Sequence, residues 1–103
     1  MLIDLRNRAN EPVVQELLSY AIGMPVPEKL KQIAKSYRED ANLALWGVED
    51  DGSLIGCLGV RCSPHGDVVI LHLSVHPAYR RRYVASRMIE SLLQSGAVQT
   101  VSA

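Results

Sequence analysis

The chain has no phenylalanine and only four tyrosines and one tryptophan in 103 residues. It also has no net charge, because eleven basic and eleven acidic side chains cancel. A global cationic field of the kind that nucleic-acid-binding domains use is therefore excluded, and any basic patch must be local. No apolar run approaches the ~20 residues that span a bilayer, and the N-terminus has no apolar core of a signal peptide. We expect a cytoplasmic protein with neither nucleic acid nor membrane as partner.

Cysteine is also scarce. Cys57 and Cys62 lie five residues apart in one extended segment. Their side chains should point to opposite faces of a strand, so a disulfide between them is not expected. We interpret both as free thiols in a reducing compartment, and neither spacing nor neighbours suggest a metal site. A chain of this length is predicted to form a single domain, residues 1–103, with a small core.

Two amphipathic helices are predicted in the first part of the chain. The first begins at Glu11 and Pro12 with Asn10 as its N-cap, because proline at the first helical position sacrifices no hydrogen bond. Gly23 ends this helix. The second helix spans Pro27–Glu39. The inward positions of the two helices are expected at Val13, Leu17, Leu18 and Ala21 in the first, and at Leu30, Ile33, Ala34 and Tyr37 in the second.

Three strands joined by short turns follow and form an antiparallel meander. The strands are expected at Asn42–Val48, Ser53–Cys62 and Val68–Val75, with turns between them. Gly56 and Gly59 weaken the middle strand, which suggests a bulge or a close approach by another backbone or by a ligand. The strands are too apolar for an open face, so helices must cover both sides of the sheet.

Two further strands complete the predicted sheet. Met1–Arg6 is expected to form a short first strand, and Ala97–Val101 begins a last one. The last strand should lie parallel to Val68–Val75, because a helix connects the two. The predicted fold class is α/β (α+β), with a mixed, mostly antiparallel central sheet of about five strands flanked by helices.

The stretch Val68–Gly96 carries the clearest functional signal. An apolar run breaks at His76-Pro77 and resumes as a helical pattern, which predicts a strand, a loop and a helix. Arg80–Arg82 precede that helix, where backbone N–H groups lack intrahelical partners and the helix dipole is positive. Such a junction suits a phosphate group. Consecutive arginines are also common on solvated surfaces, so the pattern alone leaves both interpretations open.

The same stretch resembles the signature of the GCN5-related N-acetyltransferase (GNAT) family, V-x-P-x-[aromatic]-R-x-[basic]-G-[I/V]-[G/A]. The positions that match in order and spacing are Val75, Pro77, Tyr79, Arg80, Arg82, Val84 and Ala85. Tyr83 stands where the family normally has glycine. The resemblance implies an acyl-CoA N-acyltransferase-like fold lacking its last helix and hairpin, and acetyl-CoA as co-substrate.

In the resembling family, the loop and the helix N-terminus hold the pyrophosphate of the cofactor through backbone amides, and the end of the strand pairs with the pantetheine arm. The cofactor-binding residues that this implies are Leu73, Ser74, Val75, Arg80, Arg81, Arg82, Tyr83, Val84 and Ala85. Because glycine would let the cofactor approach the backbone closely, either the ring of Tyr83 points away or pyrophosphate binding is weakened. The first two helices border the acceptor entrance in the family, so Tyr20, Met24 and Tyr37 are candidates for substrate contact.

Acetyl transfer to an amine needs an oriented thioester, a donor for the developing oxyanion and a base. A backbone N–H near Leu73 to Val75 is the expected oxyanion donor. His72 is the candidate catalytic base, because it precedes the cofactor-pairing residues and imidazole titrates near neutral pH. A half-buried neutral histidine with no catalytic role is the competing interpretation. The tyrosine that often acts as general acid in the family comes from a helix beyond the end of this sequence.

Three functions remain open from the sequence. The leading one is an acetyl-CoA-dependent N-acetyltransferase that acts on a primary amine of a small molecule or peptide. The second is a non-catalytic remnant that serves as a CoA-binding or dimerisation module, which Tyr83 and the short C-terminus favour. The exposed edge of the last strand also predicts a homodimer. The third, a nucleic-acid contact through Arg80–Arg82 and Arg87, is disfavoured by the zero net charge and the scarcity of aromatic residues.

Overall fold

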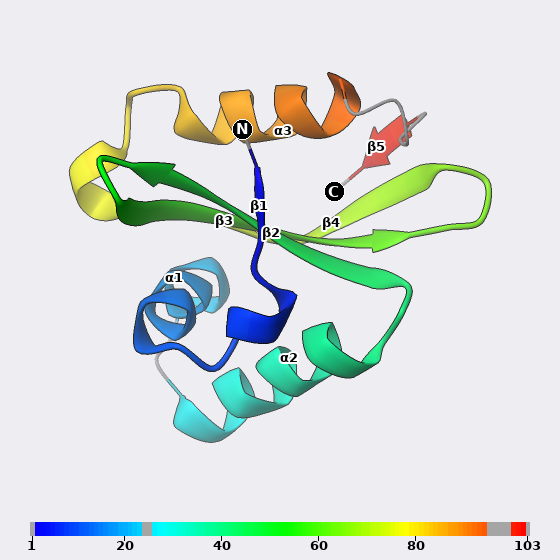
Figure 1. Ribbon diagram of the computed structural model, residues 1–103, viewed down its shortest axis with the longest axis horizontal. Helices are drawn as coiled ribbons and strands as arrows, with labels where there is room; N and C mark the ends of the chain where they lie inside the picture. The colour runs from blue at the N-terminus through cyan, green and yellow to red at the C-terminus, as the bar shows by residue number, and fades with distance from the viewer. Residues whose placement is uncertain (1, 24–25, 95–99, 103) are drawn as a thin grey trace.

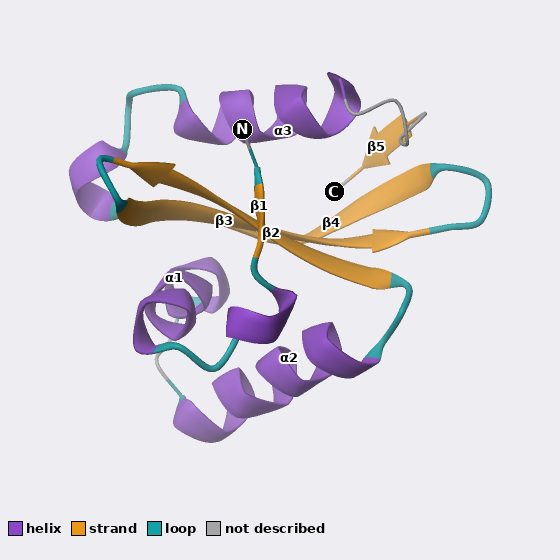
Figure 2. Cartoon of the chain, viewed as in Figure 1, coloured by secondary structure: helices purple, strands orange, loops and turns teal. Residues whose placement is uncertain are grey.

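A computed structural model describes residues 2–23, 26–94 and 100–102 of the chain. Figure 1 shows a twisted sheet with α1 and α2 on one face and α3 on the other, and Figure 2 shows the same arrangement by element type. The elements in chain order are β1 (Ile3–Asp4), the 3₁₀ helix η1 (Arg6–Arg8), α1 (Pro12–Ile22), α2 (Pro27–Glu39), β2 (Leu43–Asp50), β3 (Ser53–Cys62), β4 (Asp67–Val75), the 3₁₀ helix η2 (Pro77–Tyr79), α3 (Val84–Gln94) and β5 (Thr100–Ser102). Within the described ranges, no helix has the length and apolar character that crossing a membrane requires.

The sheet has the strand order β1-β2-β3-β4-β5. β1 to β4 pair antiparallel, and β5 pairs parallel to β4. The antiparallel sheet thus has four strands, not five, and the predicted count of about five is reached only by adding the three-residue β5. The hairpin between β2 and β3 turns at Asp51 and Gly52, both with positive φ, which is the backbone of a tight two-residue turn.

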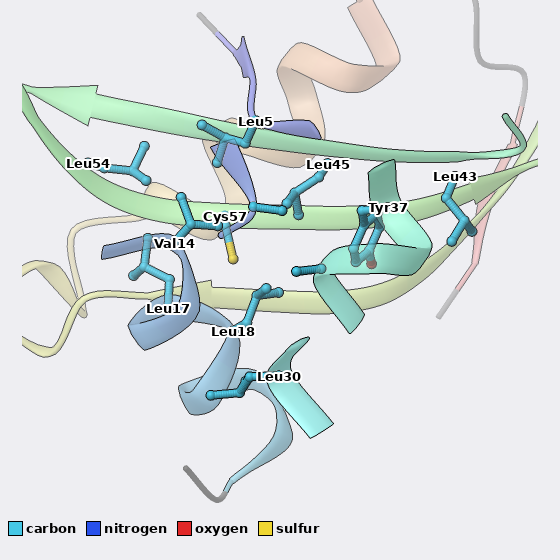
Figure 3. Close-up of a cluster of buried hydrophobic side chains, with 12 residues drawn as sticks. Leu5, Val14, Leu17, Leu18, Leu30, Tyr37, Leu43, Leu45, Leu54 and Cys57 are labelled. Carbon is cyan, nitrogen blue, oxygen red and sulfur yellow. The ribbon is translucent and has the colours of Figure 1, made fainter. Parts of the chain in front are cut away.

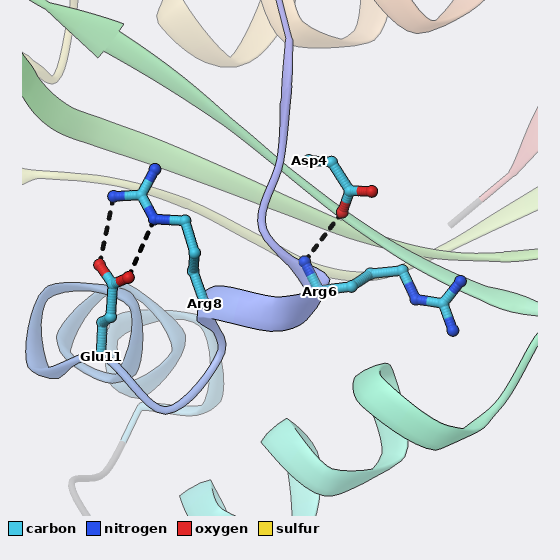
Figure 4. A network of polar contacts seen from close by, with 4 residues as sticks. All are labelled: Asp4, Arg6, Arg8 and Glu11. Carbon is cyan, nitrogen blue, oxygen red and sulfur yellow. Dashed lines mark hydrogen bonds and ion pairs between the residues drawn. The ribbon is translucent and has the colours of Figure 1, made fainter.

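The start of α1 differs from the sequence-based prediction. Its N-cap residue is Glu11, not Asn10, because Glu11 precedes Pro12 and keeps an extended backbone with φ −65° and ψ 140°. The Glu11 carboxylate accepts hydrogen bonds from the Arg8 guanidinium at 3.0 and 3.2 Å (Figure 4). Pro12 occupies the first turn and Gly23 ends the helix with φ 77°, as predicted. The buried stripe begins at Val14 rather than Val13, which is exposed, because Val14 lies three and four positions before the buried leucines of α1 and shares their face.

α2 has the predicted bounds, and its C-terminal end is fixed by Arg6. The Arg6 side chain donates hydrogen bonds to the backbone carbonyls of Tyr37 at 2.8 Å and Asp40 at 3.2 Å. The Arg6 backbone N–H in turn donates to the Asp4 carboxylate at 2.9 Å (Figure 4). Arg6 therefore satisfies carbonyls at the end of α2 and ties this end of the helix to the edge strand β1.

The sheet separates two apolar clusters. The cluster on the α1 and α2 face includes Tyr37 and Cys57 (Figure 3), and the cluster on the α3 face is built around Met88, with Cys62 packed against it. The two cysteines lie in different clusters and both are free, as predicted. Helices cover both faces of the sheet, which agrees with the apolar character of its strands.

β4 contains one more residue than β3 can pair. Gly59 is opposite His72 and Val60 is opposite Ile70, so Leu71 is an extra residue. Ile70 and Leu73 both pack against the α3 cluster although they are three positions apart. The bulge therefore resets the alternation of faces, and it directs the His72 side chain to Tyr37 on the α2 side.

Candidate functional site

The end of β4 has a backbone edge that its sheet partners do not use. The His76 N–H donates to the Ile55 carbonyl, so Ser74 and His72 also direct their backbone groups toward β3 in the alternating antiparallel pattern. Leu73 and Val75 direct theirs to the opposite edge. In the described residues, β5 pairs only with Asp67–Val69 along that edge. Among the described residues, no strand covers the backbone of Leu73 or the N–H of Val75, whereas the Val75 carbonyl accepts a hydrogen bond from Arg80 Nε at 3.2 Å. The Leu73 backbone and the Val75 N–H are thus available to an extended ligand.

The loop after β4 presents a second set of backbone groups. Tyr83 precedes α3, and its carbonyl accepts the first intrahelical hydrogen bond, from the Arg87 N–H at 3.0 Å. The N–H groups of Val84, Ala85 and Ser86 therefore have no acceptor within the helix. They lie at the positive end of the helix dipole, the arrangement that binds phosphate at helix N-termini.

These features meet at one cavity. A cavity of about 300 Å³ is lined by Val75, Tyr79, Arg80, Arg81, Tyr83, Val84, Ala85 and Ser86. Six of these residues were predicted to bind the cofactor. Ser86, the third residue of α3, lines the cavity but was not among the predicted residues. Of the other predicted residues, Ser74 is buried with its hydroxyl against the Cys57 thiol at 3.3 Å. The Arg82 guanidinium lies over the Tyr79 ring instead of lining this cavity.

Arg80 links this loop to α1. Its Nε donates to the Val75 carbonyl at 3.2 Å, and its guanidinium carbon lies 5.6 Å from the centroid of the Tyr20 ring. The Tyr20 hydroxyl donates to the Glu16 carboxylate at 2.7 Å. The Arg80 side chain therefore holds the loop in place as well as supplying a charge. Met24, the neighbouring candidate for substrate contact, lies outside the described residues.

Tyr83 has a left-handed backbone, with φ 61°, and Arg81 has φ 68°. This conformation is rare for residues with a Cβ and explains why a glycine suits position 83. The Tyr83 side chain is 77% exposed. Most of its ring therefore lies in solvent, and the left-handed backbone at this position carries a steric cost.

His72 lies on the other side of β4, against α2. Its Nδ1 is 2.6 Å from the Tyr37 hydroxyl, and the two rings meet edge to face. Burial and the nearby Lys29 ammonium lower the pKa of His72 below its usual 6.5. The ring is therefore neutral at pH 7, as a base must be. Burial raises the pKa of Tyr37 well above its usual 10, so its hydroxyl stays protonated.

The arrangement is that of an α+β acyltransferase-like domain, with an open strand edge and a helix N-terminus suited to a phosphate. The sequence profile of the acetyltransferase (GNAT) family matches residues 7–99. The chain belongs to the GNAT acetyltransferase family, which confirms the resemblance seen in the sequence.

Individual relatives agree with this membership. The chain is 34% identical over 87 residues to an uncharacterized N-acetyltransferase in the lysA 3′ region of Bacillus methanolicus, covering 82% of this chain and 71% of that protein. Its fold is similar to that of AAC(6′)-Iy in complex with a bisubstrate CoA analogue (TM-score 0.77, 14% identity, 99% of this chain and 76% of that one). It is also similar to a ribosomal-protein-alanine N-acetyltransferase from Brucella melitensis (TM-score 0.73, 20% identity, 99% and 76%). The two solved structures establish the fold, and the match to the family establishes the class of enzyme.

Proposed function

We propose that this protein is an acetyl-CoA-dependent N-acetyltransferase that acetylates a primary amine. The observation that carries the proposal is the junction at the end of β4, where an open strand edge, three free helix N–H groups and two arginines surround one cavity. An acyl-CoA has the matching parts, an extended amide arm followed by a diphosphate. Solved relatives of the same fold carry CoA or a CoA analogue.

The residues of the junction have separate roles in this proposal. The Leu73 backbone and the Val75 N–H pair with the pantetheine arm along the open edge of β4. The N–H groups of Val84, Ala85 and Ser86 bind the diphosphate, and the charges of Arg80 and Arg81 add electrostatic attraction. Arg82 and Tyr83 contribute through the backbone of the loop, and Ser74 contributes by fixing the strand against β3.

The chemistry requires a base and an oxyanion donor beside the thioester. The acceptor nitrogen attacks the carbonyl carbon of the thioester, the carbon–sulfur bond breaks, and the thiolate leaves and is protonated. His72 takes the proton that the attacking nitrogen loses. A backbone N–H on the open edge, from Leu73 or Val75, donates to the oxygen on which negative charge develops.

The acceptor belongs to the class of small-molecule or peptide amines. Two solved relatives support this class, since one binds a bisubstrate analogue that joins CoA to an acetylneamine, and the other is named a ribosomal-protein-alanine N-acetyltransferase.

We also propose that two copies associate through β5, which forms one edge of the described sheet while β1 forms the other, since an unpaired strand edge is a template for pairing. A single monomeric species at micromolar concentration in sedimentation velocity would contradict it. The two unbridged thiols favour a cytoplasmic setting.

Isothermal titration with acetyl-CoA tests the main proposal. The unmodified protein should bind in the micromolar range, and Arg81→Ala should weaken binding about tenfold by removing one charge at the diphosphate. Alanine also has a Cβ, so this change leaves the backbone strain at position 81 in place. Arg38→Ala, which removes an exposed arginine on α2, is the matched control and should bind normally.

Turnover is then measured as release of free CoA with a panel of small-molecule and peptide amines. Binding with release supports the enzyme. Saturable binding without release on any amine would favour the alternative, a CoA-binding module. Absence of binding in the unmodified protein would refute both.

A further inference from the structure

The contact between Tyr37 and His72 joins two residues that are 35 positions apart. Tyr37 is 1% exposed and belongs to the apolar cluster between α2 and the sheet (Figure 3). A hydroxyl in such a place is costly unless it is hydrogen-bonded, and phenylalanine would fill nearly the same volume without that cost. The hydroxyl therefore needs an explanation beyond core packing.

Three separate features of the fold bring this hydroxyl to the imidazole. Gly59 on β3 lacks a side chain, and a Cβ there would overlap the Tyr37 hydroxyl. The bulge at Leu71 directs His72 to the same face. Arg6 binds the backbone carbonyl of Tyr37 and fixes the end of α2. The contact is thus set by strand composition, strand register and helix position together.

We propose that Tyr37 is a positioning residue for His72: its hydroxyl accepts a hydrogen bond from Nδ1–H and leaves Nε2 free to take the proton of the acceptor amine. The inference rests on the proposed function. During the step, the amine nitrogen loses one proton to Nε2. Nδ1–H stays bonded to the hydroxyl oxygen, and Tyr37 keeps its own proton.

The surroundings of the pair disfavour a charged imidazolium at His72. The ionisable groups that act on the pair are the Lys29 ammonium on α2, and the Cys57 thiol and Arg61 guanidinium on β3. Burial and Lys29 disfavour the charged imidazolium, so His72 relies on an acceptor at Nδ1 when it becomes protonated. The Tyr37 hydroxyl supplies this acceptor and also fixes the ring edge to face at a centroid distance of 5.7 Å.

The pKa of His72 in the Tyr37→Phe variant tests the inference. Removing an acceptor from the charged form should lower this pKa further, measured by NMR titration of the imidazole C–H signals. The chain has only three histidines, and His72→Gln identifies the signal. Ser36→Ala is the matched control, because it removes a hydroxyl one position away that bonds to Gln32 on the exposed side of α2. It should leave the pKa of His72 unchanged.

The same variants are then compared in acetyl transfer. Tyr37→Phe should lower kcat about tenfold with little change in the KM for acetyl-CoA, and it should move the acidic limb of the kcat profile to lower pH. A raised pKa of His72 would show that Tyr37 donates to the neutral ring, and an unchanged one would show no coupling; either result overturns the inference. If His72→Gln retains full kcat while the unmodified protein turns over, the inference and the base role of His72 both fail, and the proposed acetyltransferase activity stands. If acetyl-CoA does not bind at all, the proposed function fails first.

Discussion

The left-handed backbone at Tyr83 allows a prediction of which of two substitutions at this position gives the more stable protein. A residue with a Cβ in this conformation costs about 1–2 kcal/mol, and glycine avoids that cost but loses about 0.5–1 kcal/mol through the entropy of the unfolded chain. The side chain is 77% exposed, and the few contacts it makes are lost equally in Tyr83→Ala and Tyr83→Gly. The comparison of these two variants therefore isolates the backbone.

We expect Tyr83→Gly to be more stable than Tyr83→Ala by about 0.5–1 kcal/mol. For a domain of this size, 1 kcal/mol corresponds to about 4–8 °C in Tm, so the glycine variant should melt several degrees higher. The assay is thermal and urea unfolding followed by circular dichroism, with equal m-values required for both variants.

Glu90, an exposed residue in the middle of α3, provides the matched control. There the order must reverse, with Glu90→Ala more stable than Glu90→Gly by about 1 kcal/mol, because a helix interior favours alanine. If Tyr83→Ala is as stable as Tyr83→Gly, the left-handed conformation at this position is not a source of strain, and the explanation of the exposed tyrosine is wrong.

Three further changes have defined outcomes. Gly59→Ala should destabilise the fold by about 1–3 kcal/mol, because the added Cβ overlaps Tyr37. In urea unfolding, Gly59→Ala should lower the free energy of unfolding by less when it is combined with Tyr37→Phe. Additive losses would show that the two residues are not in contact. Cys57 is buried, and burial raises its pKa to about 11. At pH 8 a thiol reagent should therefore modify only the less buried Cys62 in the folded protein. Rapid modification of both thiols would show that Cys57 is not buried. Arg80→Ala should weaken acetyl-CoA binding about tenfold. It should also lower Tm, because the Arg80 guanidinium connects the loop to β4 and α1. An unchanged Tm in a melting scan would show that these contacts do not stabilise the loop.

Much of the fold was predictable because the signals are local. Pro27 at the first position marks the start of α2, and Gly23 supplies the left-handed residue at the end of α1. The prediction of Asn10 as the N-cap was wrong although the signal was local. Proline disfavours a helical backbone in the residue before it, so Glu11 stays extended and becomes the N-cap.

The candidate site also has one part that the local sequence predicts and one part that depends on contacts between distant residues. Its cavity is lined by Val75 and by residues 79–81 and 83–86 of the loop and the helix start, so one short signature predicts most of the lining. The partner of His72 was not predicted, because the contact with Tyr37 depends on a bulge and on a helix far away in the sequence. Gly59 suggested a bulge or a close approach by another backbone or a ligand, whereas the group that occupies the space is the Tyr37 side chain. A missing side chain does not say which group lies against it.

The extra residue Leu71 has a consequence for how the chain tolerates deletions. A deletion of Leu71 would place His72 directly opposite Gly59 without a bulge, and every neighbouring side chain would keep its face. Such a protein would retain every residue proposed here for binding and catalysis, each in its present register against β3. In a regular strand, the loss of one residue would instead turn every following side chain to the opposite face.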